Sequence, residues 1–216
     1  MLKKFTTVAV SLLGAVATSA ATLPTPSYAT SVNTQISVLV EESNTQETAT
    51  KEVAPEKPKV KRLVCKGCNL NEIKTLNFLQ DNGLTDKNAI ATIMGNIRQE
   101  SSFHANICEG GARVSYHSCR SGGYGLIQFT NAPRFYGLGK FAARYGGNPS
   151  TLDTQLKYIM YESDWKMIEN QMKTPGGTIP YYMRLARKWI RWGHKGARTD
   201  YAYGYAKKLV FAEVEI

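Results

Sequence analysis

Two motifs mark the middle of the chain, Gly95-Asn-Ile-Arg-Gln-Glu-Ser-Ser-Phe103 and Gly122-Gly-Tyr-Gly-Leu-Ile-Gln-Phe-Thr130. An amphipathic helix leads into the first motif, since the i, i+3, i+4, i+7 positions of one helix face hold Ile90, Ile93, Met94 and Ile97. Glu100 then falls in the last turn, on the flank of this apolar stripe. The pattern therefore predicts a helix that ends in an inward-leaning carboxyl group, followed by a glycine-rich turn that carries Gln128.

The expected position of Glu100 has a chemical consequence. Burial disfavours the carboxylate anion, and the negative end of the helix dipole does the same, so both raise the pKa of Glu100. A carboxylic acid that stays protonated near neutral pH can donate the proton needed for glycoside cleavage. The alternative interpretation is an ion pair with an arginine close in sequence, for which the candidates are Arg98, Arg113 and Arg120.

The order Gly95-Asn96, Glu100-Ser101 and Gly125-Leu-Ile-Gln128-Phe resembles the phage tail lysozyme family, a branch of the lysozyme-like superfamily. Goose-type lysozymes and soluble lytic transglycosylases also show Glu-Ser followed by Gly-Leu-Met-Gln. The resemblance covers residues 73–165. It implies a lysozyme-like fold, Glu100 as the catalytic acid, and a substrate site formed by Ser101, Tyr124, Gly125 and Gln128. From its place in the turn alone, Tyr124 suits either sugar stacking or loop packing.

The reaction type stays open at the sequence level. Ile127 replaces the methionine of the transglycosylases, and no Ala-Tyr-Asn-Ala-Gly segment follows. Glycosidases commonly use two carboxyl groups, and the candidates for a second one are Glu109 and Asp153. A single acid fits lytic transglycosylation, in which the N-acetyl group and 6-hydroxyl of the sugar replace the second carboxylate and the water. The expected function is a muramidase that cuts the glycan backbone of peptidoglycan without a cofactor or metal.

Charge suggests a second class of function. The net charge is +10, with 27 basic and 17 acidic residues, which suits an anionic partner. Trp189 and Trp192 lie among the basic residues Arg184, Arg187, Lys188, Arg191, Lys195 and Arg198. Stacking combined with charge would suit a non-catalytic secreted module that binds wall polymer or nucleic acid. The motif around Glu100 has no role in such a module, so peptidoglycan is the expected partner, nucleic acid is not, and the protein is expected to be a monomer.

Residues 1–29 have the pattern of a secretory signal peptide. Lys3 and Lys4 precede a small apolar stretch, and Ser27-Tyr-Ala29 supplies small residues at −3 and −1. The apolar stretch is shorter than the roughly 20 residues of a membrane span. Export to the periplasm or the medium is therefore expected, with no membrane attachment after cleavage. Residues 30–62 contain no aromatic residue and predict a disordered tether, and residues 63–216 predict the catalytic domain.

Four cysteines behind a signal peptide favour disulfide bonds. Three connectivities are possible, and we favour Cys65 with Cys68 and Cys108 with Cys119, because the second bond would close a loop rich in Gly, Ser and Arg. A zinc site is disfavoured because no patterned histidines accompany the cysteines.

The remaining pattern is mainly helical. Helices are expected at residues 71–81, from a cap at Thr85 to Glu100, at 135–145, from a cap at 150–151 to about 172, at 181–192 and at 200–214. Only residues 113–116 and 124–129 suggest extended structure. The fold class is therefore mainly α, of the α+β lysozyme-like type, with a small irregular or β-like lobe beside the catalytic helix.

Overall fold

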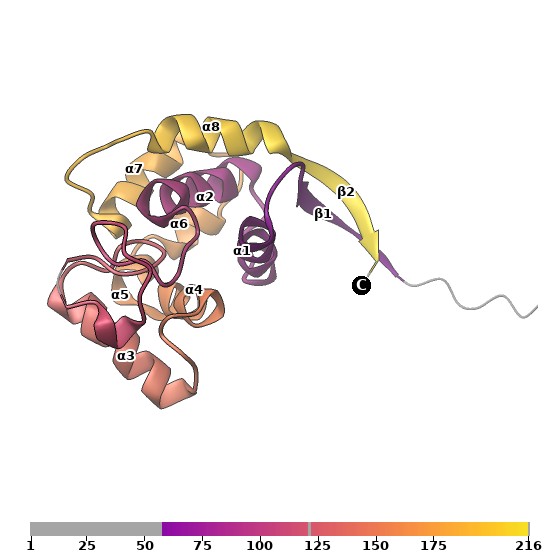
Figure 1. Ribbon diagram of the computed structural model, residues 1–216. Coiled ribbons are helices and arrows are strands. Elements are labelled where there is room, and N and C mark those ends of the chain that lie inside the picture. Colours follow the sequence, from indigo (N-terminus) through magenta and orange to yellow (C-terminus); the bar gives the residue numbers. More distant parts are fainter. Residues whose placement is uncertain (1–57, 121, 216) are drawn as a thin grey trace, which may run out of the picture. The chain divides into compact units, whose positions relative to one another are not determined.

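The computed structural model describes residues 58–120 and 122–215. The expected signal peptide and the tether up to residue 57 lie outside the described residues. In chain order the elements are β1 (Lys59–Cys65), α1 (Leu70–Asp81), α2 (Lys87–Ser101), the 3₁₀ turn η1 (Tyr116–Ser118), α3 (Ala132–Tyr145), α4 (Leu152–Tyr161), α5 (Ser163–Lys166), α6 (Glu169–Lys173), α7 (Ile179–Ile190), α8 (Arg198–Lys208) and β2 (Leu209–Glu215), as Figure 1 shows. The described part is thus mainly helical with a small β component, as the sequence predicts.

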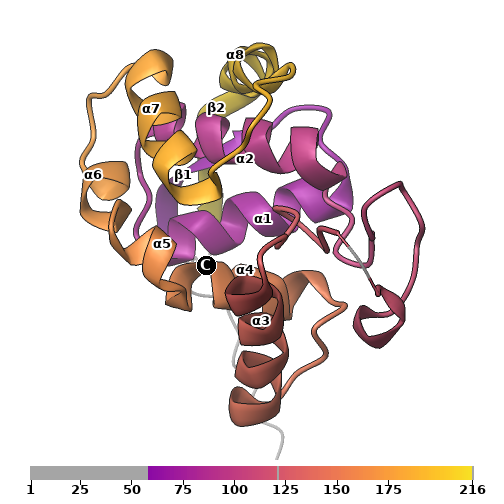
Figure 2. The same cartoon turned by 90° about the vertical axis from the view of Figure 1, so that its left-hand side faces the viewer.

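Helix α2 is the centre of the core. It lies between α1 and α8, with α7 beside it (Figure 2), and every residue from Ala89 to Ile97 is buried. The N-cap of this helix is Asp86, whose side chain accepts hydrogen bonds from the backbone N–H groups of Asn88 and Ala89. The expected cap at Thr85 is wrong by one residue, since both residue types can cap a helix and only geometry selects between them. The buried helix delivers Glu100 at its C-terminal end.

Helix α8 crosses α2 at close range because Gly95 has no side chain. A Cβ atom built on Gly95 would lie 2.6 Å from the backbone nitrogen of Ala202 and 2.9 Å from the carbonyl oxygen of Arg198. Both are backbone atoms of α8, so they cannot move without moving the helix. Gly95 therefore sets the distance between the helix that carries Glu100 and the helix that carries Arg198.

We expect Gly95→Ala to destabilise the protein by about 2 kcal/mol, because overpacking at a close helix crossing forces the backbone apart. Gly204→Ala is the matched control, since it lies in α8 and nothing is within 4 Å of its added Cβ. Alanine is the better helix former, so this control should be neutral or stabilising by up to about 1 kcal/mol. Urea denaturation of both variants measures the difference, and equal stabilities would contradict the role of Gly95.

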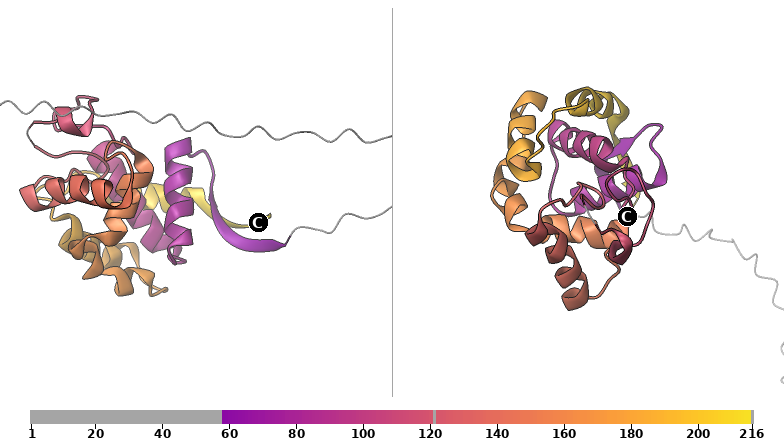
Figure 3. Two further views of the ribbon diagram at one scale, coloured as in Figure 1. Left: turned by 90° about the horizontal axis from the view of Figure 1, so that it is seen from below. Right: turned by 60° about the vertical axis from the view of Figure 1, so that its left-hand side comes forward.

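A two-stranded antiparallel sheet joins the two ends of the described chain (Figure 3). Strand β1 pairs with β2 from Lys59 opposite Glu215 to Cys65 opposite Leu209. One expectation is corrected here, since the helix expected to reach residue 214 ends at Lys208. Strand β1 begins at Lys59, ahead of Leu63, where the sequence predicts the start of the domain. Each strand forms because it pairs with the other, which lies about 150 residues away in the chain. A local sequence pattern does not reveal such a distant partner.

The single helix expected to reach residue 172 is divided into α4, α5 and α6. The first break falls at Glu162, whose backbone is extended. This conformation accompanies an inward carboxylate, which accepts two hydrogen bonds from Arg134 and one from the indole N–H of Trp189. The N-cap of α4 is Thr151, within the predicted cap segment.

The segment between α2 and α3 forms the expected irregular lobe. Isolated antiparallel bridges join Ile107 to Arg113 and Cys108 to Tyr124. The turn η1 lies in the chain between Arg113 and Tyr124. Two disulfide bonds, Cys65–Cys68 and Cys108–Cys119, confirm the favoured pairing. The second bond spans 11 positions and closes the lobe. None of the helices in the described residues is long and apolar enough to cross a membrane.

Candidate active site

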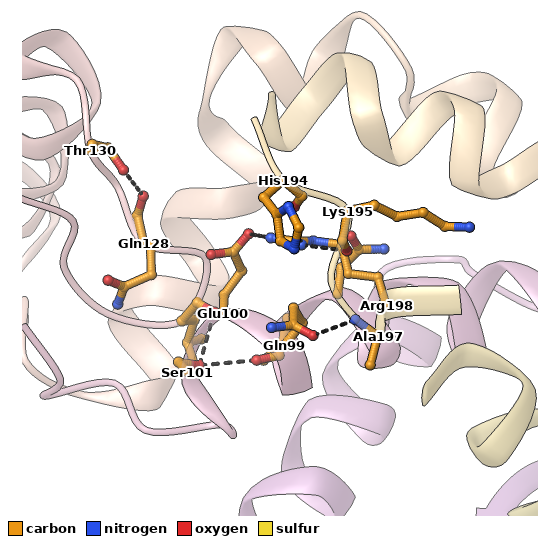
Figure 4. A network of polar contacts seen from close by, with 12 residues as sticks. Gln99, Glu100, Ser101, Gln128, Thr130, His194, Lys195, Ala197 and Arg198 are labelled. Atoms are coloured by element: carbon orange, nitrogen blue, oxygen red, sulfur yellow. Dashed lines mark hydrogen bonds and ion pairs between the residues drawn. The ribbon is translucent and has the colours of Figure 1, made fainter. Parts of the chain in front are cut away.

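A cleft of about 490 Å³ opens beside the end of α2. One wall comes from the lobe and the start of α3, and the other from the end of α7 and the connection to α8. The lining residues are Glu100, Ile127, Gln128, Thr130, Asn131, Arg134, Ile190, Arg191, Trp192, Gly193, His194 and Arg198. In Figure 4 the carboxylate of Glu100 lies between Gln128 on one side and His194 and Arg198 on the other. The predicted acid and the predicted glutamine therefore share one cleft.

Glu100 is a largely buried acid, with 13 % of its side chain exposed. Burial raises its pKa above the ordinary range, while the hydrogen bond and charge of Arg198, and then the charge of Arg134, act in the opposite direction. The effect of burial is the largest, so the carboxyl group takes up a proton more readily than an exposed glutamate. This agrees in direction with the expectation from the helix pattern.

Arg198 is the ion-pair partner of Glu100. Its Nη2 donates to Oε1 of Glu100, although the two residues are 98 positions apart. Nη1 donates to the carbonyl oxygens of His194 and Lys195, both at 2.7 Å, and the guanidinium lies 4.9 Å from the centre of the Trp192 ring. The ion-pair interpretation is thus correct in kind but wrong in partner, because Arg98, Arg113 and Arg120 are not paired with Glu100 in the described structure.

The turn that carries Gln128 is held from below. Gly125 has φ +76°, and a Cβ there would lie 2.2 Å from the amide oxygen of Gln155. Gln155 accepts from the N–H of Leu126 and donates to the carbonyl oxygen of Ala105. Gln128 itself has φ +50°, and its Nε2 donates to the carbonyl oxygen of Gly125 at 3.1 Å. Gln155 therefore shapes the turn, although no local sequence pattern indicates this contact.

Three of the four residues predicted to bind substrate, Ser101, Tyr124 and Gly125, do not line the cleft. Ser101 is buried, and its hydroxyl donates to the carbonyl oxygen of Leu126, which ties the end of α2 to the turn. Tyr124 is fully buried, donates to the carbonyl oxygen of Val114 and packs edge-on against Tyr116. Of the two interpretations of Tyr124, the structure therefore favours packing. The side chains of Ser101 and Tyr124 pack beneath the surface of the cleft, where a bound sugar does not contact them in this conformation.

Neither candidate for a second acid lies in the cleft. Glu109 accepts the N–H of Gly123 at the outer side of the lobe, and Asp153 is exposed on α4 in an ion pair with Lys157. Glu100 is the only carboxylate among the described residues that line the cleft. Within the described residues no group of three or more His, Cys, Asp or Glu side chains is arranged to hold a metal ion.

The family model described as Phage tail lysozyme matches residues 70–209. The chain belongs to the phage tail lysozyme family. The match extends beyond the motif region at residues 73–165 and includes α7 and α8, so both walls of the cleft lie within it. A search of curated proteins found no match.

In this member of the phage tail lysozyme family, Arg134 is a cleft residue that the motifs did not indicate. Its side chain is 10 % exposed and forms two hydrogen bonds with Glu162, at 2.8 and 2.5 Å. Its guanidinium also lies 5.4 Å from the centre of the Phe129 ring. The pair fixes a positive charge at the cleft wall, near enough to Glu100 to oppose the rise in its pKa.

The basic cluster expected to support a non-catalytic binding module is divided in this lysozyme-family protein. Trp189 is fully buried against Trp165 and bonded to Glu162, so it cannot stack on a ligand. Arg198 points inward to Glu100, and Arg191 pairs with Asp164. Only Trp192 of the two tryptophans lines the cleft. The arrangement therefore lacks the paired stacking surface that the alternative function requires.

Proposed function

We propose that this protein is an exported muramidase that cleaves the glycan backbone of peptidoglycan, with Glu100 as the general acid. The observation that carries the proposal is the position of Glu100: within the described structure it is the only carboxylate of the cleft, and burial raises its pKa. Membership of the phage tail lysozyme family supports the class of substrate.

The proposed chemistry follows from the different surroundings of the two carboxyl oxygens of Glu100. Oε1 of Glu100 accepts from Arg198, which leaves Oε2 for the substrate. Protonated Glu100 gives its proton to the glycosidic oxygen as the bond from that oxygen to the anomeric carbon breaks. The carboxylate that forms keeps the hydrogen bond from Arg198. Burial thus favours the proton donor before the step, and Arg198 stabilises the anion after it.

The second half of the reaction uses Glu100 as a base. The N-acetyl group of the cleaved sugar can stabilise the positive charge at the anomeric carbon in place of a second carboxylate. The Glu100 anion then takes a proton from a water molecule, which gives hydrolysis, or from the 6-hydroxyl of the same sugar, which gives a 1,6-anhydro product. The absence of another carboxylate among the described lining residues supports participation of the N-acetyl group in either case.

The raised pKa of Glu100 predicts the direction of the pH profile. The acid must be protonated to act, so kcat/KM should fall as pH rises through this pKa, which lies above the ordinary carboxyl range. The same group stabilises the fold by its protonated form, and this contribution is present at low pH and lost as pH rises through the folded pKa. A rate profile that stays flat through the range in which NMR detects Glu100 losing its proton would contradict its role as proton donor.

Export is a separate part of the proposal. It is supported by the amino-terminal pattern and by the two disulfide bonds, which form and persist in oxidising compartments. We expect the mature chain to begin near Thr30 and to be found outside the cytoplasm. Amino-terminal sequencing of protein from its natural source tests this, and a cytosolic form that retains Met1 would be the contrary result.

A further inference from the structure

A second groove, of about 500 Å³, adjoins the cleft. Helix α7 forms one side of it and the connection to α8 forms the other. Its lining residues are Pro180, Met183, Arg184, Arg187, Trp192, Gly193, Lys195 and Thr199. Trp192 and Gly193 line both the groove and the cleft. A ligand that fills the cleft can therefore extend past these two residues into the groove.

The groove carries three positive charges and no acidic lining residue. Arg184, Arg187 and Lys195 are exposed, and none of them forms an ion pair with a residue that the structure describes. Arg184 and Arg187 are three positions apart on α7, so they lie on one helix face and repel each other. The neighbouring cations differ, since Arg191 and Arg198 each have a carboxylate partner. An anionic ligand would relieve the repulsion.

The floor of the groove is apolar. Met183 is buried, and Trp192 is partly covered by the guanidinium of Arg198. A ligand that suits both features has carboxylates spaced along a short chain with small apolar side chains. A glycan strand without peptides carries only the lactyl carboxylate of each muramic acid and no small apolar side chains, and a uniformly charged polymer lacks the apolar groups.

We propose that this groove binds the stem peptide of the peptidoglycan strand whose glycan occupies the cleft. The proposal rests on the proposed function. Stem peptides branch from the glycan next to the bonds that a muramidase cleaves, and they carry free carboxylates and alanine methyl groups. The carboxylates pair with Arg184 and Arg187 in charge-assisted hydrogen bonds, and the methyl groups pack on Met183 and Trp192.

The test compares two substrates: glycan strands that carry stem peptides, and the same strands after an amidase has removed the peptides. The full chain and its Arg184→Gln/Arg187→Gln variant are assayed on both. We expect the variant to lose about five- to tenfold in kcat/KM on the peptide-bearing strands, through KM, because two exposed charge pairs are lost. Cleavage of the peptide-free strands should change by less than about twofold. The loss should also shrink as salt screens the charges.

Lys188→Gln/Lys207→Gln is the matched control. It removes two exposed positive charges, one from α7 and one from α8, that do not line the groove. This control should behave like the unaltered protein on both substrates. An equal loss for both double variants, or an equal loss on both substrates, would show a general effect of charge and overturn the proposal. No loss on either substrate would overturn it as well.

Direct binding separates this proposal from the proposed function. Calorimetry with a disaccharide–tetrapeptide, and with the same compound carrying amidated carboxylates, needs no cleavage. We expect the unaltered chain to bind the compound with free carboxylates more tightly than the amidated compound. The Arg184→Gln/Arg187→Gln variant should show no such preference. If both compounds bind alike, the groove proposal fails even in an active enzyme. If cleavage fails while this preference is present, the proposed function fails and the groove proposal stands.

Discussion

Glu100→Gln is expected to lower peptidoglycan cleavage by about a hundredfold or more, the range seen when a general acid is lost. The substitution preserves size, and the amide oxygen of the new side chain can still accept the hydrogen bond that Arg198 donates to Glu100. The cost in stability should therefore be about 1 kcal/mol, the scale of one hydrogen bond. Release of reducing ends or loss of turbidity measures activity, and urea denaturation measures the fold.

Two control variants test whether Glu100, and not another residue, donates the proton. Gln128→Ala should lower cleavage only about tenfold, because the role we propose for its amide is to position substrate and not to supply a proton. Glu109→Gln should have little effect, since its carboxylate bonds to Gly123 outside the cleft. Full activity of Glu100→Gln together with inactivity of Glu109→Gln would show that Glu100 is not the proton donor. A large loss of stability in Glu100→Gln would instead indicate that the pair with Arg198 is mainly structural.

Arg134→Met is expected to destabilise the protein by about 4 kcal/mol. The substitution leaves Glu162, which is 4 % exposed, buried with only the indole N–H of Trp189 as partner. Removing one member of a buried pair is costly because the remaining charge has no compensation. Burial, followed by the charge of this carboxylate, raises the pKa of Tyr158 to about 12, so the charge of Glu162 acts on a buried neighbour. Urea denaturation gives the free energy of unfolding.

The double variant Arg134→Met/Glu162→Gln provides the internal control. It removes both charges and keeps an acceptor for Trp189, so it should recover most of the stability lost in the single variant. Lys157→Met at the exposed Asp153–Lys157 pair should change stability by less than about 1 kcal/mol. A double variant that is no more stable than Arg134→Met would show that packing, not the charge pair, accounts for the loss.

The features that the sequence predicts well are those that local periodicity and turn chemistry encode. The apolar spacing from Ile90 to Ile97 predicts α2, and the glycines before Gln128 predict the turn beside it. Burial of Glu100 follows from the helix face on which it lies. These features depend only on residues that are close in the chain.

The features that the sequence did not reveal depend on distant partners. Arg198 belongs to the basic cluster that suggested a polymer-binding module, and only the close crossing of α8 at Gly95 brings it to Glu100. The sequence of β2 continues the helical pattern of α8, but these residues form a strand because β1 supplies their hydrogen-bond partners. The break at Glu162 is accompanied by its pair with Arg134 on α3. In each case a contact between distant segments determines the local structure.

Mass spectrometry of the fragments released from purified peptidoglycan tests the assignment of Glu100 most directly, because it reports which bond is cut and how. The unaltered protein should release disaccharide–peptides that end in muramic acid, either as the reducing sugar or as its 1,6-anhydro form, which is lighter by one water. Under the same conditions Glu100→Gln should release almost none of them. The same disaccharide–peptides in equal yield from Glu100→Gln, or only peptide fragments from the unaltered protein, would contradict the proposed mechanism.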